Sequence, residues 1–128
     1  MKSVRRILCA LLLALLILST CTACAVNHEK WILGTWSFQK EYHYSGVLDC
    51  TITFNADKTL NFVGINKATG TYRFKENDAL RVVIGSGGFE IYDYEYDAQK
   101  GREKDSGCWC MINRDRMFMD GVMYKRVK

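Results

Sequence analysis

The chain has 128 residues and a formal net charge of +4 at pH 7. Its length suits one domain and leaves no room for two. Three of the positive charges, on Lys2, Arg5 and Arg6, belong to a segment that we expect to be removed, so the remaining domain is only slightly basic. Such a balance argues against a nucleic-acid partner, which normally requires a concentrated basic face.

The amino terminus has the order of a secretion signal. Residues 1–6 carry three positive charges and no acid, residues 7–18 form an unbroken apolar run, and small residues fill 19–25. This order of charged, apolar and small residues is typical of an export signal. The apolar run is shorter than the roughly 20 residues of a membrane span. Extending it to Val26 would reach that length, so an uncleaved anchor is the alternative.

The cleavage zone resembles that of bacterial lipoproteins, in which an apolar residue and two small residues precede a cysteine that becomes lipidated. Leu18-Ser19-Thr20-Cys21 and Cys21-Thr22-Ala23-Cys24 both fit in part, so Cys21 and Cys24 are the two candidates for lipidation. We therefore assign residues 1–24 to a signal peptide that is cut before one of them, and residues 25–128 to the domain. A lipid anchor holds a domain at a membrane surface without spanning it. In a third frame an ordinary signal peptidase would cut at residues 23–25 and release a soluble product.

Three other cysteines, Cys50, Cys108 and Cys110, remain in the domain. Export implies an oxidising compartment, where structural disulfides are common. We expect Cys50 to pair with Cys108 or Cys110, which would close a loop of about 60 residues and contribute roughly 4 kcal/mol. The Cys-x-Cys spacing differs from the Cys-x-x-Cys of zinc and thioredoxin-like sites, so we expect no metal.

From Gly34 onward, apolar and polar residues alternate in short runs that are separated by turn residues, the pattern of half-buried strands. We expect about eight or nine strands in an all-β, antiparallel meander that closes into a barrel, since closure removes the exposed edges. Residues 28–33 form a lead-in that we expect to plug one end. The expected inward residues include Trp36, Phe38, Tyr42, Tyr44, Cys50, Phe54, Leu60, Phe62, Tyr72, Val82 and Ile84.

The chain resembles the lipocalin-like (calycin-type) barrels at Gly34-Thr35-Trp36 and at Arg126 near its end. In those barrels a Gly-x-Trp opens the first strand and an Arg of the last strand packs over the Trp. The resemblance therefore implies that Gly34, Trp36 and Arg126 close the barrel. The whole chain is similar to the small lipocalin-like lipoproteins of Bacteroides-type bacteria, through residues 52–59, 70–72 and 124–126. It is shorter than a typical lipocalin and shows no carboxy-terminal helix, which argues against a deep pocket.

The segment from Phe89 to Asp97 places tyrosines and acids on opposite faces. We expect Tyr92, Tyr94 and Tyr96 to face inward and the acids to be solvated. In the alternative, a reversed or bulged strand would bring carboxylates into the barrel, where they would meet a cationic ligand.

No combination of residues indicates a reaction. His43 is expected to be a solvated surface residue, and nothing orients it toward Cys50 for nucleophilic catalysis. We therefore expect a protein that is not an enzyme and has no cofactor.

We expect the barrel to bind a small apolar or aromatic ligand while a lipid tethers it to a membrane of the cell envelope, facing the periplasm or the surface. The alternative is a protein–protein or envelope-assembly module with a filled barrel. The expected ligand-binding residues are Trp36, Phe38, Phe54, Phe62, Tyr72, Trp109 and Met111.

Overall fold

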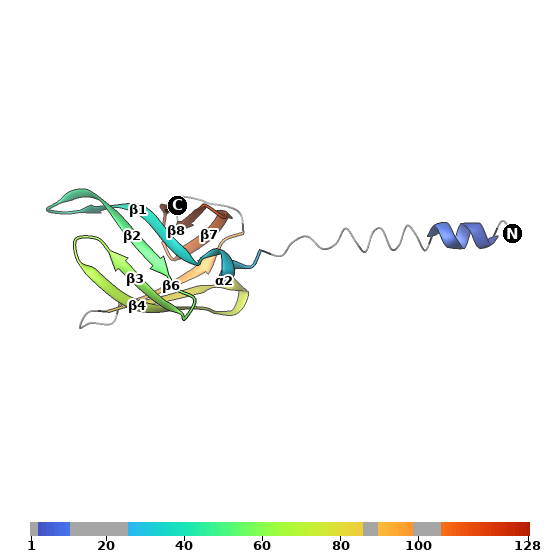
Figure 1. Cartoon of the computed structure of the whole chain (residues 1–128), viewed down its shortest axis with the longest axis horizontal. Coiled ribbons are helices and arrows are strands. Elements are labelled where there is room, and N and C mark those ends of the chain that lie inside the picture. Colours follow the sequence, from blue (N-terminus) through green and yellow to red (C-terminus); the bar gives the residue numbers. More distant parts are fainter. Residues whose placement is uncertain (1–2, 11–25, 86–89, 99–105) are drawn as a thin grey trace.

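A computed structural model describes residues 3–10, 26–85, 90–98 and 106–128 (Figure 1). Residues 3–10 are helical. Cys21 and Cys24 lie outside the described residues. The other described residues form the helix α2 (His28–Trp31), the 3-10 helix η1 (Glu76–Asp78) and nine strands with their connections. The strands are β1 (Gly34–Tyr42), β2 (Gly46–Phe54), β3 (Thr59–Val63), β4 (Lys67–Phe74), β5 (Leu80–Ile84), β6 (Glu90–Tyr96), β7 (Cys108–Asn113), β8 (Arg116–Met119) and β9 (Val122–Arg126).

The strands form a closed barrel in chain order, from β1 to β9, which confirms the predicted all-β barrel. Neighbouring strands pair antiparallel, except that β7 runs parallel to β6. Glu95 lies opposite Cys108, and Tyr96 lies opposite Trp109. A parallel pair needs a long connection, and residues 97–107 supply it here.

The alternation seen in the sequence decides which side chains fill the interior. In β1, Trp36 and Phe38 are buried, and in β2 Cys50, Ile52 and Phe54 are buried. Large apolar side chains on alternate positions give an antiparallel sheet one buried face. Tyr44 was expected to face inward, but β1 ends at Tyr42 and Tyr44 is exposed in the turn.

The lead-in before the first strand forms α2, which begins after the cap residue Asn27, whose side chain accepts a hydrogen bond from the Lys30 amide. Asn is a favoured residue at this position because its side-chain oxygen satisfies an amide that the helix leaves open. His28 and, just after the helix, Ile32 are both buried. The short helix lies at the end of the barrel opposite the tip of the β1–β2 hairpin (Figure 1).

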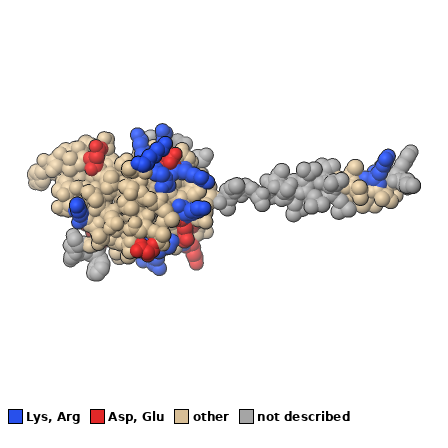
Figure 2. Space-filling view, viewed as in Figure 1, with Lys and Arg blue, Asp and Glu red and all other residues tan. Residues whose placement is uncertain are grey.

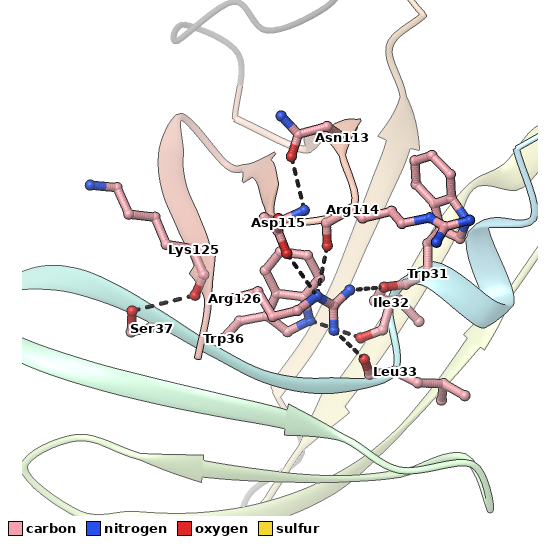
Figure 3. A network of polar contacts seen from close by, with 10 residues as sticks. All are labelled: Trp31, Ile32, Leu33, Trp36, Ser37, Asn113, Arg114, Asp115, Lys125 and Arg126. Atoms are coloured by element: carbon pink, nitrogen blue, oxygen red, sulfur yellow. Dashed lines mark hydrogen bonds and ion pairs between the residues drawn. The ribbon is translucent and has the colours of Figure 1, made fainter. Parts of the chain in front are cut away.

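The first and last strands meet at Trp36 and Arg126, which are register partners. The Arg126 guanidinium lies 4.3 Å from the centre of the Trp36 ring. The Trp36 Nε1 donates a hydrogen bond of 2.8 Å to the Ile32 carbonyl (Figure 3). This is the arrangement that the resemblance implied, and it joins α2, β1 and β9.

The Arg126 side chain also donates hydrogen bonds to three backbone carbonyls. Its Nε lies 2.6 Å from the oxygen of Arg114 and its Nη1 lies 2.5 Å from the oxygen of Leu33. Its Nη2 donates to Trp31 (Figure 3). A planar guanidinium with several fixed donors suits such a role better than an ammonium group.

Gly34 is required beside this contact. Its φ of +111° is one that side-chain-bearing residues rarely adopt, and an added Cβ would lie 2.9 Å from Arg126 Nη1. Glycine alone adopts such a conformation without steric cost. The first residue of β1 therefore leaves the space that Arg126 occupies.

The expected disulfide from Cys50 to Cys108 or Cys110 is not present, because the Cys50 thiol is not bonded to either of them. Cys50 faces the core from β2, whereas in β7 it is Trp109 and Met111 that belong to the core cluster. Because side chains alternate along a strand, Cys108 and Cys110 lie on the other face of β7. The barrel wall therefore separates them from Cys50.

Charged side chains on the face in Figure 2 are mixed in sign, with Lys and Arg gathered toward the end next to the N-terminal segment and acidic groups among them. On the outer face of the sheet, Arg81 donates two hydrogen bonds, of 2.7 and 2.8 Å, to Asp93. This hydrogen bonding holds the pKa of the Asp93 carboxyl down at about 2. Within the described ranges no helix has the length and apolar character needed to cross a membrane.

Candidate functional site

A cavity of about 650 Å³ occupies the end of the barrel opposite α2. Its walls come from the far end of β1, the β3–β4 turn, the start of β6 and the β8–β9 turn. The size falls in the range of pockets that hold small organic molecules. The lining residues are Phe38, Gln39, Lys40, Glu41, Tyr42, Ile52, Phe62, Ile65, Asn66, Ala68, Val82, Ile84, Gly85, Glu90, Tyr92, Tyr94, Met119, Asp120, Val122 and Tyr124.

Two of the seven residues expected to bind a ligand, Phe38 and Phe62, line this cavity. The other five belong to the filled part of the interior, which leaves them no contact with the cavity: Trp36, Phe54, Tyr72, Trp109 and Met111. Alternation indicates correctly that these side chains face inward. It does not indicate where along the barrel axis the packed core ends and the cavity begins.

Aromatic side chains form one wall of the cavity. The rings of Phe38 and Tyr124 lie 4.3 Å apart, centre to centre, and those of Phe38 and Phe62 lie 6.0 Å apart. Tyr92 and Tyr94 are stacked, 6.1 Å apart with planes only 4° from parallel. Such rings offer extended faces for packing against a flat apolar ligand.

Tyr94 and Tyr124 are both more than nine-tenths buried, with exposed fractions of 9% and 8%. Among the residues that the structure describes, neither hydroxyl has a hydrogen-bond partner, and both tyrosines line the cavity. Burial raises the pKa of each, and the negative charge of Asp120 raises it further. Both phenols therefore stay protonated at neutral pH and can donate or accept a hydrogen bond.

Two carboxylates lie beside the tyrosines. Glu90 accepts a hydrogen bond from the Tyr92 hydroxyl, and this bond, with burial, raises the pKa of Tyr92 to about 12. Asp120 occupies the β8–β9 turn, where its Oδ1 accepts a hydrogen bond of 3.0 Å from the Gly107 amide. The turn is an Asp-Gly hairpin turn, with positive φ at both Asp120 and Gly121.

The pairing between β6 and β7 is short next to these acids. Among the described residues, only Glu95 and Tyr96 of β6 pair with β7. Residues 90–94 pair with β5 on one side and have no strand partner on the other side within the described part of the chain. The cavity therefore lies beside a stretch of β6 that is paired on one side in the described residues.

At the opposite end, His28 forms a cluster that sequence reasoning missed. Its ring centre lies 4.5 Å from that of Tyr96 and 5.2 Å from that of Trp109, and its Nδ1 lies 3.2 Å from the Asp78 carboxylate. The spacing of His28 and Ile32 on one helical face was the available signal. These residues close the base of the barrel and do not line the cavity.

His43 is exposed, and among the described residues its ring contacts that of Tyr44. The Cys50 thiol is buried and lies 3.7 Å from the Tyr42 hydroxyl. Across the described residues, no group of three or more His, Cys, Asp or Glu side chains is arranged to hold a metal ion.

Comparison with known proteins adds no assignment. No family model matches the chain, and neither curated proteins nor solved structures give a match. The function therefore has to be inferred from the cavity and the residues that line it.

Proposed function

We propose that this barrel is an exported, membrane-tethered protein that binds a small apolar or aromatic molecule in the cavity. The observation that carries the proposal is the unfilled volume of about 650 Å³ walled by Phe38, Phe62, Tyr92, Tyr94 and Tyr124. Apolar and aromatic walls with a few polar groups are characteristic of small-molecule sites.

A barrel whose interior is filled along its whole length would favour the alternative, a protein–protein interaction module. The α2 end is filled, with Trp36, Trp109 and Phe54 almost fully buried. The other end holds the cavity. This contrast supports ligand binding over the alternative.

The position of the cavity also suits a tether at the amino terminus. The N-terminal segment reaches the barrel at α2, and the cavity lies at the other end. A lipid on Cys21 or Cys24 would then leave the cavity facing away from the membrane. Such an orientation keeps the binding site accessible to solutes.

Filling the cavity tests the binding function. Ala68 faces inward from β4 and lines the cavity, so Ala68→Phe places a ring in the open volume. We expect the affinity for N-phenyl-1-naphthylamine, measured by its fluorescence, to fall at least tenfold, while stability changes by no more than about 1 kcal/mol because there is room for the ring.

Thr69→Phe is the matched control, because Thr69 is the next residue of the same strand and faces outward. It should bind the probe as the unchanged protein does. Equal binding by all three proteins, or no binding by any of them, would contradict the proposal.

The tether is tested by the intact mass of the protein recovered from the envelope of an expressing bacterium. We expect a diacylglyceryl mass on a chain that begins at Cys21 or Cys24, and its loss in only one of the variants Cys21→Ser and Cys24→Ser. A mature chain that begins at Val26 and carries no lipid would show that the protein is soluble instead.

A further inference from the structure

The charges around the cavity are unevenly distributed. Glu90 and Asp120 lie beside the buried tyrosines, whereas Lys40 is the basic residue of the lining. Resting on the binding function proposed above, we propose that the cavity selects a cationic aromatic molecule, in which a flat ring carries a protonated amine.

Glu90 belongs to the inner face of β6. Side chains alternate along a strand, so Glu90 shares its face with Tyr92 and Tyr94, while Asp93 and Glu95 face outward. The Glu90 carboxylate accepts a hydrogen bond from the Tyr92 hydroxyl, which places it at the aromatic wall. Glu90, the first residue of β6, is therefore the acidic residue of this strand that faces the cavity.

Glu90 and Asp120 differ in their ion pairing from Asp93, which faces outward from β6. Asp93 forms ion pairs with Arg81 at 2.7 Å and with Lys75 at 3.2 Å. Neither Glu90 nor Asp120 forms an ion pair with any residue that the structure describes. Within the described residues, Glu90 and Asp120 therefore differ from Asp93 in that no cationic side chain neutralises them.

The charge of Asp120 reaches three tyrosines of the wall. The hydrogen bond to Glu90 is the largest cause of the raised pKa of Tyr92, and burial is the largest cause for Tyr94 and Tyr124; the Asp120 charge adds to the pKa of all three, because a phenolate near a carboxylate is disfavoured. The same field favours a cation. The hydroxyls of Tyr94 and Tyr124, which have no hydrogen-bond partner among the described residues, can accept hydrogen bonds from an ammonium group, and the tyrosine faces attract a cation.

Lys40 acts in the opposite direction. By alternation it shares the inner face of β1 with Phe38 and Tyr42, and its Nζ lies 5.3 Å from the centre of the Tyr42 ring. Glu41 is the neighbouring residue of β1 and, by alternation, points out of the barrel. Two acids, Glu90 and Asp120, therefore line the cavity together with one base, Lys40, which lies at Tyr42.

Three probes with one ring system and different charges test the selection. Calorimetric titration at pH 7 would compare 1-naphthylmethylamine, which is protonated, with neutral 1-naphthalenemethanol and anionic 1-naphthoate. We expect the amine to bind about tenfold more tightly than the alcohol, which corresponds to about 1.4 kcal/mol, and the carboxylate to bind most weakly.

The double variant Glu90→Gln, Asp120→Asn removes both charges while keeping an acceptor oxygen at each position. The amine should then bind within about threefold of the alcohol, and the alcohol should keep its affinity, since a neutral ligand does not respond to the removed charges. Glu95→Gln, an outward acid of the same strand, is the control and should leave the preference unchanged. Lys40→Met should strengthen amine binding about threefold.

The outcomes separate the two proposals. Equal binding of the three probes, or tightest binding of 1-naphthoate, would overturn the preference for a cation and leave the binding function standing. A preference for the amine that survives in the double variant would also overturn the assigned roles of Glu90 and Asp120. Failure of all three probes to bind would overturn both proposals.

Discussion

Arg126→Met is expected to lower the free energy of unfolding by about 3 kcal/mol, because hydrogen bonds to a charged donor contribute about 1.5–3 kcal/mol and leave acceptors unsatisfied when removed. The variant loses the hydrogen bonds to three backbone carbonyls and the contact with the Trp36 ring. Denaturant titration followed by tryptophan fluorescence would measure the loss.

Two further variants locate the cause of this effect. Lys125→Met removes a positive charge from the adjacent residue, whose side chain is exposed, and should change stability by less than about 0.5 kcal/mol. Arg126→Lys keeps the charge without the planar fork and should recover only a minor part of the loss. If lysine restored full stability, charge alone would explain the role of Arg126.

Trp109→Ala is expected to be at least as destabilising, by about 4 kcal/mol, the range measured for large aromatic residues truncated in a core. Trp109 has an exposed fraction of 1% and packs against His28, Phe74 and Tyr96. Its Nε1 also donates a hydrogen bond of 3.1 Å to the Asp78 carbonyl. Thermal unfolding followed by circular dichroism would check the value.

Trp31→Ala is the control for that variant. Trp31 is only partly buried, and its ring lies beneath the Arg114 guanidinium at 5.4 Å. We expect a loss of about 1 kcal/mol, in keeping with an exposed cation–π contact. Equal losses from the two tryptophans would contradict the view that the base of the barrel is held by Trp109.

The barrel and its closure follow from local chemistry that a sequence displays. The alternation of residues such as Trp36, Phe38, Ile52 and Phe54 determines which faces are buried, and the Asp120-Gly121 pair specifies its own turn. These are short-range properties of the chain. For that reason they could be predicted without coordinates.

The position of the cavity could not be predicted in this way. Trp36 and Phe38 share one face of β1, yet one is sealed in the core and the other lines the cavity. The difference depends on α2 and Ile32 filling one end, which is a contact between elements. The parallel pairing of β6 with β7, and the wall that separates Cys50 from Cys110, are long-range properties of the same kind.

Arg126 and the cavity lie at opposite ends of the barrel. This separation affects which substitutions the protein can tolerate. Positions such as Ile65, Ala68 and Val122 line the cavity without taking part in the contacts of Arg126. Libraries randomised at these positions should yield mostly folded proteins with altered ligand preference. The scaffold is therefore suited to acquiring new specificities by exchange of a few side chains at one end.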